Sequence, residues 1–188
     1  AQAMLAGDAM QALAFEVLTP GDGEVPDALQ ACLCRLLARS AGHAGMAGGQ
    51  AIDLASVGKP LDETTLRDMH RRKTGALLQA SVLMGAACGA PSMQAWQALS
   101  DYGAAIGLAF QVVDDILDVT ADSALLGKTA GKDAAADKPT YVSLLGLRAS
   151  QAFADELHGQ AHRALDASGL HQPERLRALA DMVVKRNN

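Results

Sequence analysis

Three aspartates, Asp114, Asp115 and Asp118, lie in an otherwise apolar stretch of the chain. In a helix, carboxylates at positions i, i+1 and i+4 point into an arc of roughly 100°. Like charges held that close repel one another, and on a buried helix they also lose hydration. A Mg²⁺ ion removes both penalties, because it prefers oxygen ligands and typically binds one or two carboxylates together with substrate phosphates. The aspartates therefore predict half of a metal–phosphate site.

The element that must position these aspartates is a predicted helix over residues 92–119. A polar stripe runs along this helix, and apolar side chains cover most of the remaining circumference. The stripe consists of Gly103, Gly107, Gln111, Asp114 and Asp118. Because such a helix belongs in a core, we expect the stripe to face an internal cavity, with the glycines leaving room below the carboxylates. In the alternative interpretation, the glycines only allow close helix packing and the aspartates cap a surface end, although acids near a helix C-terminus oppose the helix dipole.

A lysine interrupts the apolar face of a second predicted helix, residues 61–88. Lys73 falls in the middle of that face. An ammonium directed inward could neutralise phosphate oxygens, and Thr74 on the same edge could add a hydrogen bond. The alternative is a lysine whose stem packs on the apolar face while its charge reaches water. His70 flanks the same edge, and we interpret it as structural.

Two further segments carry weaker signals. Small residues between 45 and 54 predict close approach to a neighbouring helix, and Gln50 and Asp53 fall on one side near the end of this segment. The stretch 120–138 is the longest irregular piece and directly follows the aspartates. A loop of that length in a compact helical domain is often functional. It contains Lys128, Lys132 and Lys138.

Composition favours a helical protein. Apolar residues make up 49% of the 188 residues and aromatic residues only 3%, a balance that disfavours strands. The net charge of −5 argues against nucleic-acid binding. The three cysteines lack zinc-like spacing, and we interpret them as buried thiols in a reducing cytosol. Because the chain carries no signal peptide and no run of about 20 apolar residues, we expect a cytoplasmic protein without membrane insertion.

Proline positions mark the expected helix boundaries, because proline is tolerated at a helix start. Six long helices are predicted, and no strand pattern competes with them. Their ranges are 1–18, 27–53, 61–88, 92–119, 139–167 and 173–186. Since there is no internal repeat and no linker, we expect a single all-α domain over residues 1–188.

Taken together, these residues resemble the trans-isoprenyl diphosphate synthases, most closely the bacterial farnesyl and geranyl diphosphate synthases of the geranyltranstransferase type. The matching strings span nearly the whole chain in the family's order. They are LAGDAMQAL (5–13), GMAGGQAIDL (45–54), HRRKTGAL (70–77), FQVVDDILD (110–118), LGK (126–128), KPTYVSLLG (138–146) and KRN (185–187). The resemblance implies an isoprenoid-synthase-type helical bundle around a central cavity, usually as a homodimer. It also implies Mg-dependent head-to-tail condensation of an allylic diphosphate with isopentenyl diphosphate, giving farnesyl or geranyl diphosphate and pyrophosphate.

The resemblance further implies roles for individual residues. Asp114 would ligate the Mg²⁺ that bridges to the allylic diphosphate, and Asp115 and Asp118 would act in the same shell, directly or through water. With Lys73 and Gln111, the first two aspartates would form the catalytic set. The positions that match substrate-binding residues of the family are Gln50, Lys73, Thr74, Gln111, Lys128 and Lys138.

One departure from the family's pattern limits these expectations. The family's first aspartate-rich motif and its residues for isopentenyl diphosphate are absent, so we expect the N-terminal helices to be missing. Three Mg²⁺ ions are expected in the intact enzyme, and this chain would supply ligands for about one of them, so we expect the chain alone to be inactive. The alternatives are a short homologue that acts as a non-catalytic partner subunit, or another Mg-dependent isoprenoid enzyme of the terpene cyclase type.

Overall fold

The computed structural model describes residues 1–21, 23–120 and 139–186. Within these ranges the secondary structure is helical throughout and contains no strand, which confirms the all-α fold class. The helices are α1 (Gln2–Leu18), α2 (Asp27–Ala41), α3 (Met46–Ala55), α4 (Glu63–His70), the π-helical turn η1 (Arg71–Gly75), α5 (Ala76–Cys88), α6 (Met93–Thr120), α9 (Tyr141–Leu145), α10 (Leu147–Ala167) and α11 (Glu174–Lys185).

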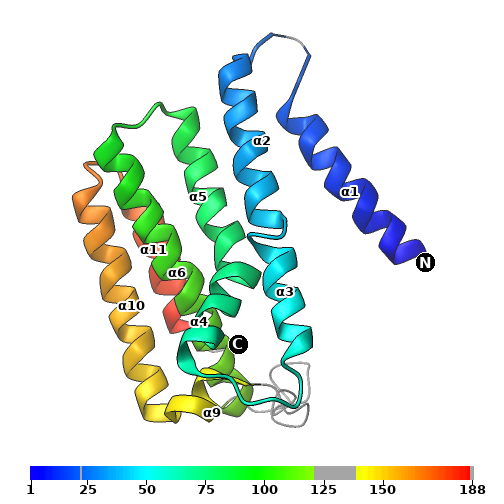
Figure 1. Ribbon diagram of the computed structural model, residues 1–188. Helices are drawn as coiled ribbons and strands as arrows, with labels where there is room; N and C mark the ends of the chain where they lie inside the picture. The colour runs from blue at the N-terminus through cyan, green and yellow to red at the C-terminus, as the bar shows by residue number, and fades with distance from the viewer. Residues whose placement is uncertain (22, 121–138, 187–188) are drawn as a thin grey trace.

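The long helix α6 forms the centre of the bundle (Figure 1). It packs against α5 on one side and against α10 and α11 on the other. Apolar side chains of α6 supply both halves of the core, with Val112 buried near its C-terminal end and Tyr102 near its middle. The hydroxyl of Tyr102 donates a 2.7 Å hydrogen bond to the Leu176 carbonyl and so joins α6 to α11. The predicted core position of the aspartate helix is confirmed.

The predicted helix over 27–53 is wrong in one respect, because the chain turns between α2 and α3. Gly42 ends α2 in an extended conformation. A Cβ at Gly45 would lie 2.8 Å from the Arg39 carbonyl oxygen, and one at Gly48 would lie 2.9 Å from the His43 carbonyl carbon. The turn therefore depends on glycines that are also poor helix formers, at a cost of about 1 kcal/mol each.

Two other predicted helices are also divided. In the range 61–88, Asp62 caps α4 by accepting a 2.7 Å hydrogen bond from the Thr65 amide, and the π-helical turn η1 separates α4 from α5. In the range 139–167, Gly146 adopts a positive φ of 84° and separates α9 from α10. The remaining helices agree with their predicted ranges to within two residues.

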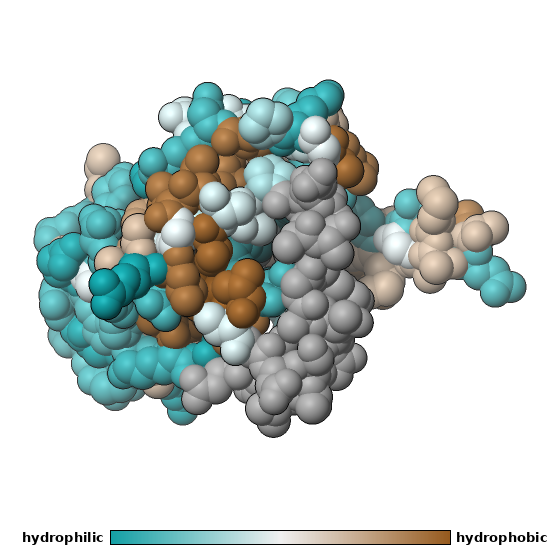
Figure 2. Space-filling model, turned by 90° about the horizontal axis from the view of Figure 1, so that it is seen from below, coloured by the Kyte–Doolittle hydropathy of each residue, from teal (hydrophilic) through white to brown (hydrophobic). Residues whose placement is uncertain are grey.

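Helix α1 stands apart from the rest of the molecule and projects from it (Figures 1 and 2). It buries none of its residues, although it carries several exposed apolar side chains. The end of the molecule that Figure 2 shows from below carries both apolar and polar side chains. This is the end toward which α6 runs in Figure 1, and it therefore carries the aspartates.

Two expectations about membrane insertion and about the cysteines can be compared with the structure. None of the described helices is both long and apolar enough to cross a membrane. All three cysteines are free thiols, but they are not all buried, since Cys32 and Cys34 are half-buried and Cys88 is exposed. Cys88 ends α5 one residue before the turn into α6, where the helix leaves the core.

Candidate functional site

Lys73 is directed at a buried carboxylate. The π-helical turn η1 faces α3, and the Lys73 Nζ lies 2.7 Å from Oδ2 of Asp53. The Asp53 side chain is only 8% exposed, whereas that of Lys73 is 32% exposed. The lysine therefore does not simply reach into bulk water. Its ammonium compensates a carboxylate that would be costly to bury alone, and part of the side chain stays accessible from outside.

Glycines set the spacing between the helices that carry the candidate residues. A Cβ at Gly49 of α3 would lie 2.6 Å from the Lys73 Cα, and one at Gly107 of α6 would lie 2.8 Å from the Gly75 Cα. Gly103 similarly faces the Cα of Gln79, at 2.9 Å from an added Cβ. The prediction that Gly103 and Gly107 leave space below the carboxylates is therefore wrong, because the backbone of η1 and α5 fills that space.

A direct hydrogen bond connects η1 to the polar stripe of α6. Oγ1 of Thr74 donates to Oε1 of Gln111 at 2.9 Å. Gln111 lies three residues before Asp114, on the same side of α6. The structure thus joins Thr74 to Gln111, whereas Lys73 pairs with Asp53 of α3, the helix on which Gln50 lies half-buried. The remaining predicted substrate-binding residues, Lys128 and Lys138, lie outside the described residues, as does Lys132.

Asp114 contacts the end of the chain. Nη2 of Arg186 donates to Asp114 Oδ1 at 2.9 Å and to the Phe110 carbonyl oxygen at 2.8 Å. The guanidinium also lies over the Phe110 ring, 4.0 Å from its centre. The Asp114 side chain remains 52% exposed, so it is accessible to a ligand. Arg186 lies in one of the strings that resemble the family, but its contact with Asp114 could not be predicted because the two residues are 72 positions apart in the sequence.

Asp115 points in a different direction and is buried, with an exposed fraction of 3%. Its Oδ2 accepts a 2.7 Å hydrogen bond from the Tyr141 backbone amide, at the start of α9. The Tyr141 ring stacks on His70 at a centre-to-centre distance of 5.5 Å. Burial raises the pKa of Tyr141 to about 12, so its hydroxyl stays protonated at neutral pH. Asp115 therefore anchors α9 to α6, whatever further role it has.

Replacing Asp115 with alanine is expected to lower the free energy of unfolding by about 1–3 kcal/mol, because the buried Tyr141 amide loses its acceptor. Asp115→Asn keeps a carbonyl oxygen at that position and should recover part of the loss. Asp114→Ala, one residue away but exposed, is the matched control. Denaturant unfolding of the three variants measures the difference, and equal stability of Asp115→Ala and Asp114→Ala would contradict this structural role for Asp115.

The three aspartates do not converge as tightly as a ligand cluster. Within residues 1–21, 23–120 and 139–186, the group of His, Cys, Asp or Glu side chains whose ligand atoms all lie within 4.8 Å of one another is His158, His162 and Asp181. Asp114 and Asp118 lie one turn apart at the end of α6. They offer oxygen donors on one side of the helix, which suits a cation shared with a bound phosphate.

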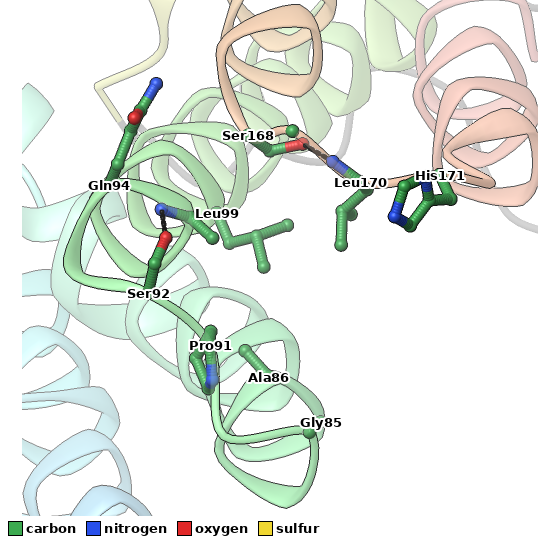
Figure 3. Close-up of a pocket in the computed structure, with 12 residues that line it drawn as sticks. Gly85, Ala86, Pro91, Ser92, Gln94, Leu99, Ser168, Leu170 and His171 are labelled. Atoms are coloured by element: carbon green, nitrogen blue, oxygen red, sulfur yellow. Dashed lines mark hydrogen bonds between the residues drawn. The ribbon is translucent and has the colours of Figure 1, made fainter.

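A cavity of about 610 Å³ lies at the opposite end of the bundle (Figure 3). It is bounded by the turn between α5 and α6 and by the turn between α10 and α11, with Pro91, Ser92, Leu99 and Leu170 among its lining residues. Ala95 also lines this cavity, and it lies roughly 30 Å from Asp114 along the axis of α6. The cavity therefore belongs to a different part of the molecule from the aspartates.

The chain is similar to proteins of known class over most of its length. The family model of the polyprenyl synthetases matches residues 1–169. The chain belongs to the polyprenyl synthetase family, which confirms the resemblance to the trans-isoprenyl diphosphate synthases.

Individual relatives are similar over the whole chain. The probable farnesyl diphosphate synthase of Bradyrhizobium diazoefficiens is 46% identical over 100% of this chain and 56% of its own length. The farnesyl diphosphate synthase of Escherichia coli is 44% identical over 100% of this chain and 64% of its own length. A geranyltransferase from Helicobacter pylori, solved with magnesium and isoprenyl diphosphate, is 34% identical with a TM-score of 0.83 and covers 97% of this chain and 60% of its own. The chain thus spans less than two thirds of these relatives.

Proposed function

We propose that the protein containing this chain is a trans-prenyltransferase. It would condense an allylic diphosphate, dimethylallyl or geranyl, head to tail with isopentenyl diphosphate, releasing pyrophosphate and farnesyl or geranyl diphosphate. The observation that carries this proposal is the string Phe110–Asp118 at the end of the central helix α6. Within this string, Gln111 accepts a hydrogen bond from Thr74, and the accessible Asp114 lies about one turn further along the helix. Farnesyl diphosphate is favoured as the product because several similar proteins are farnesyl diphosphate synthases.

The donor set at the end of α6 fits magnesium. Asp114 and Asp118 present hard oxygen donors one turn apart, and Asp115 adds negative charge while its Oδ2 holds the Tyr141 amide. Bound here, Mg²⁺ would neutralise the leaving diphosphate and so favour ionisation of the allylic substrate. Asp114 would exchange its contact with Arg186 for the metal, which leaves the Arg186 guanidinium close to the anion.

Lys73 supports the same reaction from η1. Its ammonium would bind a diphosphate oxygen, while Asp53 holds the side chain in position. Lys128 and Lys138 are proposed to bind the same anion. Positive charge placed in advance on the leaving group is the electrostatic contribution that most lowers the barrier in reactions of this kind.

The half-buried polar groups beside this anion site would face the allylic cation. Gln111 and Thr74 are fixed by their mutual hydrogen bond, and Gln50 lies on the adjacent helix α3. Their oxygens would stabilise the positive charge or orient a metal-bound water. The packed apolar side chains of α6 would exclude bulk water from the cation until the second substrate attacks.

The cellular location and the oligomeric state that we propose follow from the resemblance to the trans-isoprenyl diphosphate synthases. We propose a homodimer that acts in the cytoplasm. Sedimentation of the intact protein measures its mass in solution, and a monomer that retains full activity would contradict the dimer.

The activity is tested by incubating the intact protein with geranyl diphosphate, isopentenyl diphosphate and Mg²⁺. We expect pyrophosphate release and a farnesyl product, both abolished when the metal is chelated. No pyrophosphate release would reject the assignment. Activity that appears only after addition of a second, different subunit would instead favour the non-catalytic partner subunit.

A further inference from the structure

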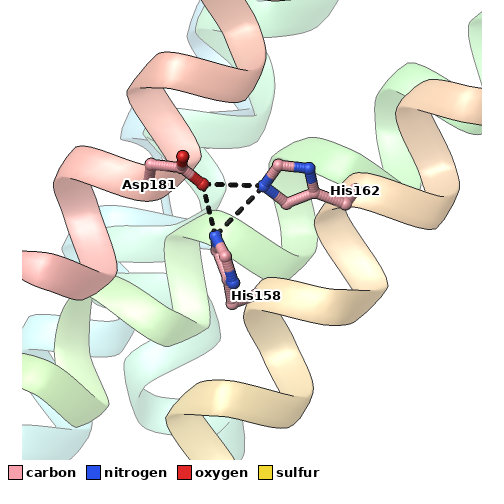
Figure 4. Close-up of side chains that lie close together, drawn as sticks. All are labelled: His158, His162 and Asp181. Carbon is pink, nitrogen blue, oxygen red and sulfur yellow. Dashed lines mark hydrogen bonds and ion pairs between the residues drawn. The ribbon is translucent and has the colours of Figure 1, made fainter.

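Two histidines and an aspartate meet on the surface formed by α10 and α11, away from the residues considered so far. His158 and His162 are one turn apart on α10, and Asp181 faces them from α11 (Figure 4). Oδ1 of Asp181 lies 2.6 Å from Nε2 of His158 and 2.9 Å from Nε2 of His162. The two Nε2 atoms lie 3.0 Å from each other. All three side chains are partly exposed.

Protons alone leave this arrangement crowded. If both Nε2 atoms carry hydrogens and donate to Oδ1 of Asp181, the two N–H groups converge on one oxygen, with their nitrogens only 3.0 Å apart. If only one Nε2 carries a hydrogen, the lone pair of the other points at a carboxylate oxygen. A single cation between the three atoms satisfies every contact, because each of them can then present a lone pair to it.

We propose that His158, His162 and Asp181 form a binding site for a transition-metal dication of the Zn²⁺ class, which joins α10 to α11. Two imidazoles and one carboxylate form a donor set that suits Zn²⁺ and its neighbours and not Mg²⁺, which prefers oxygen ligands. Ligand atoms on a tetrahedral Zn²⁺ at 2.0–2.1 Å are about 3.3 Å apart, with a water as the fourth ligand. From their present distances of 2.6 to 3.0 Å, the three ligand atoms need to separate by about 0.3–0.7 Å, and the exposure of the side chains permits this.

Two neighbouring cations, Lys185 and Arg177, contact the ligands of this site. Lys185 pairs with Oδ2 of Asp181 at 3.4 Å, so Oδ1, the oxygen that faces the histidines, remains available to a metal. Nη1 of Arg177 lies 3.1 Å from Nδ1 of His162. When Nε2 binds a metal, the neutral ring carries its proton on Nδ1, so Arg177 must turn away, and its pairing with Asp166 gives it another partner. Arg177 therefore weakens metal binding.

The consequence for the fold lies on α11. Arg186 is the residue that directly follows α11, five residues after Asp181. Arg186 contacts Asp114. A metal that fixes α11 to α10 would therefore also restrain the helix end from which Arg186 reaches Asp114.

The test is a titration of the intact protein with Co²⁺ in millimolar Mg²⁺, followed by visible absorption and by calorimetry. We expect one Co²⁺ per chain, the absorption of a tetrahedral site, displacement by Zn²⁺, and a rise in the melting temperature. His158→Ala and His162→Ala should each weaken binding at least about tenfold. Arg177→Gln, which removes the competing donor, should tighten it.

The controls separate this site from the proposed function. His171→Ala removes a histidine from the other end of α10–α11 and should leave binding unchanged, and so should Asp114→Ala. Circular dichroism establishes that each variant is folded. If His158→Ala does not fold, the milder change His158→Gln replaces it. Absence of tetrahedral absorption in the parent protein, or its persistence in His158→Ala and His162→Ala, would overturn the proposal. Neither result depends on prenyl transfer.

Discussion

Turnover of the intact protein is expected to fall by roughly 100-fold or more when Asp114 is replaced with alanine, with the melting temperature nearly unchanged. Asp114 would be the most accessible ligand of the proposed metal, since its side chain is 52% exposed at the end of α6. Its removal costs little stability for two reasons. The partly exposed ion pair with Arg186 contributes at most about 1 kcal/mol, and loss of one carboxylate relieves repulsion from Asp115 and Asp118.

The matched control is Asp101→Ala on the same helix. Asp101 is also exposed, and its carboxylate accepts a 2.9 Å hydrogen bond from Gln97. Steady-state turnover, the Mg²⁺ concentration at half-maximal rate and the melting temperature are measured for both variants. Asp114→Ala should lose turnover and require more Mg²⁺, whereas Asp101→Ala should match the parent. If Asp114→Ala instead unfolds, the aspartate has a structural role and the metal assignment is wrong.

The aspartate helix could be predicted from the sequence because local periodicity determines it. The helix α6 matches its predicted range within one residue at each end, and the aspartates fall at its C-terminal end as expected. The break between α2 and α3 could not be predicted because it depends on how these helices pack. Isolated glycines cost too little to end a helix with certainty, and the turn at Gly42–Gly45 forms where α2 packs against α5 while α3 packs against α4 and η1.

The partners of the candidate residues could not be predicted, because a helical wheel shows a direction and not a neighbour. The sequence placed Lys73 on the apolar face of its helix, but its partner Asp53 is twenty residues earlier and on another helix. Arg186 reaches Asp114 across a separation of seventy-two residues. The pair His158 and His162, one turn apart, was visible in the sequence, but nothing there indicated that Asp181 faces it. Contacts of this kind depend on how helices pack.

The largest loss of stability is expected for Gly49→Ala. A Cβ at this position would lie 2.6 Å from the Lys73 Cα and closer still to its backbone nitrogen. The obstacle is the backbone of η1, which cannot rotate aside as a side chain can. We expect the free energy of unfolding to fall by about 3 kcal/mol or more, at the upper end of the range for overpacked cores.

Gly85→Ala is the matched control, since Gly85 also lies within a helix but an added Cβ meets nothing within 4 Å. There the gain in helix propensity should stabilise the protein by up to about 1 kcal/mol. The two variants carry the same chemical change, so opposite shifts of the denaturant midpoint report on packing alone. Equal shifts would contradict the close approach of α3 to η1.

The same substitution also tests how Lys73 is held. Moving α3 away from η1 separates Lys73 from Asp53, whose buried carboxylate then lacks its nearest cation. If Asp53 positions the lysine for the diphosphate, Gly49→Ala should lower turnover further than its loss of stability explains, under conditions where the variant remains folded. The double variant Gly49→Ala with Asp53→Asn removes the unpaired charge and should recover stability but not turnover. Recovery of both would mean that the lysine acts without the aspartate, and that the tight contact at Gly49 serves packing only.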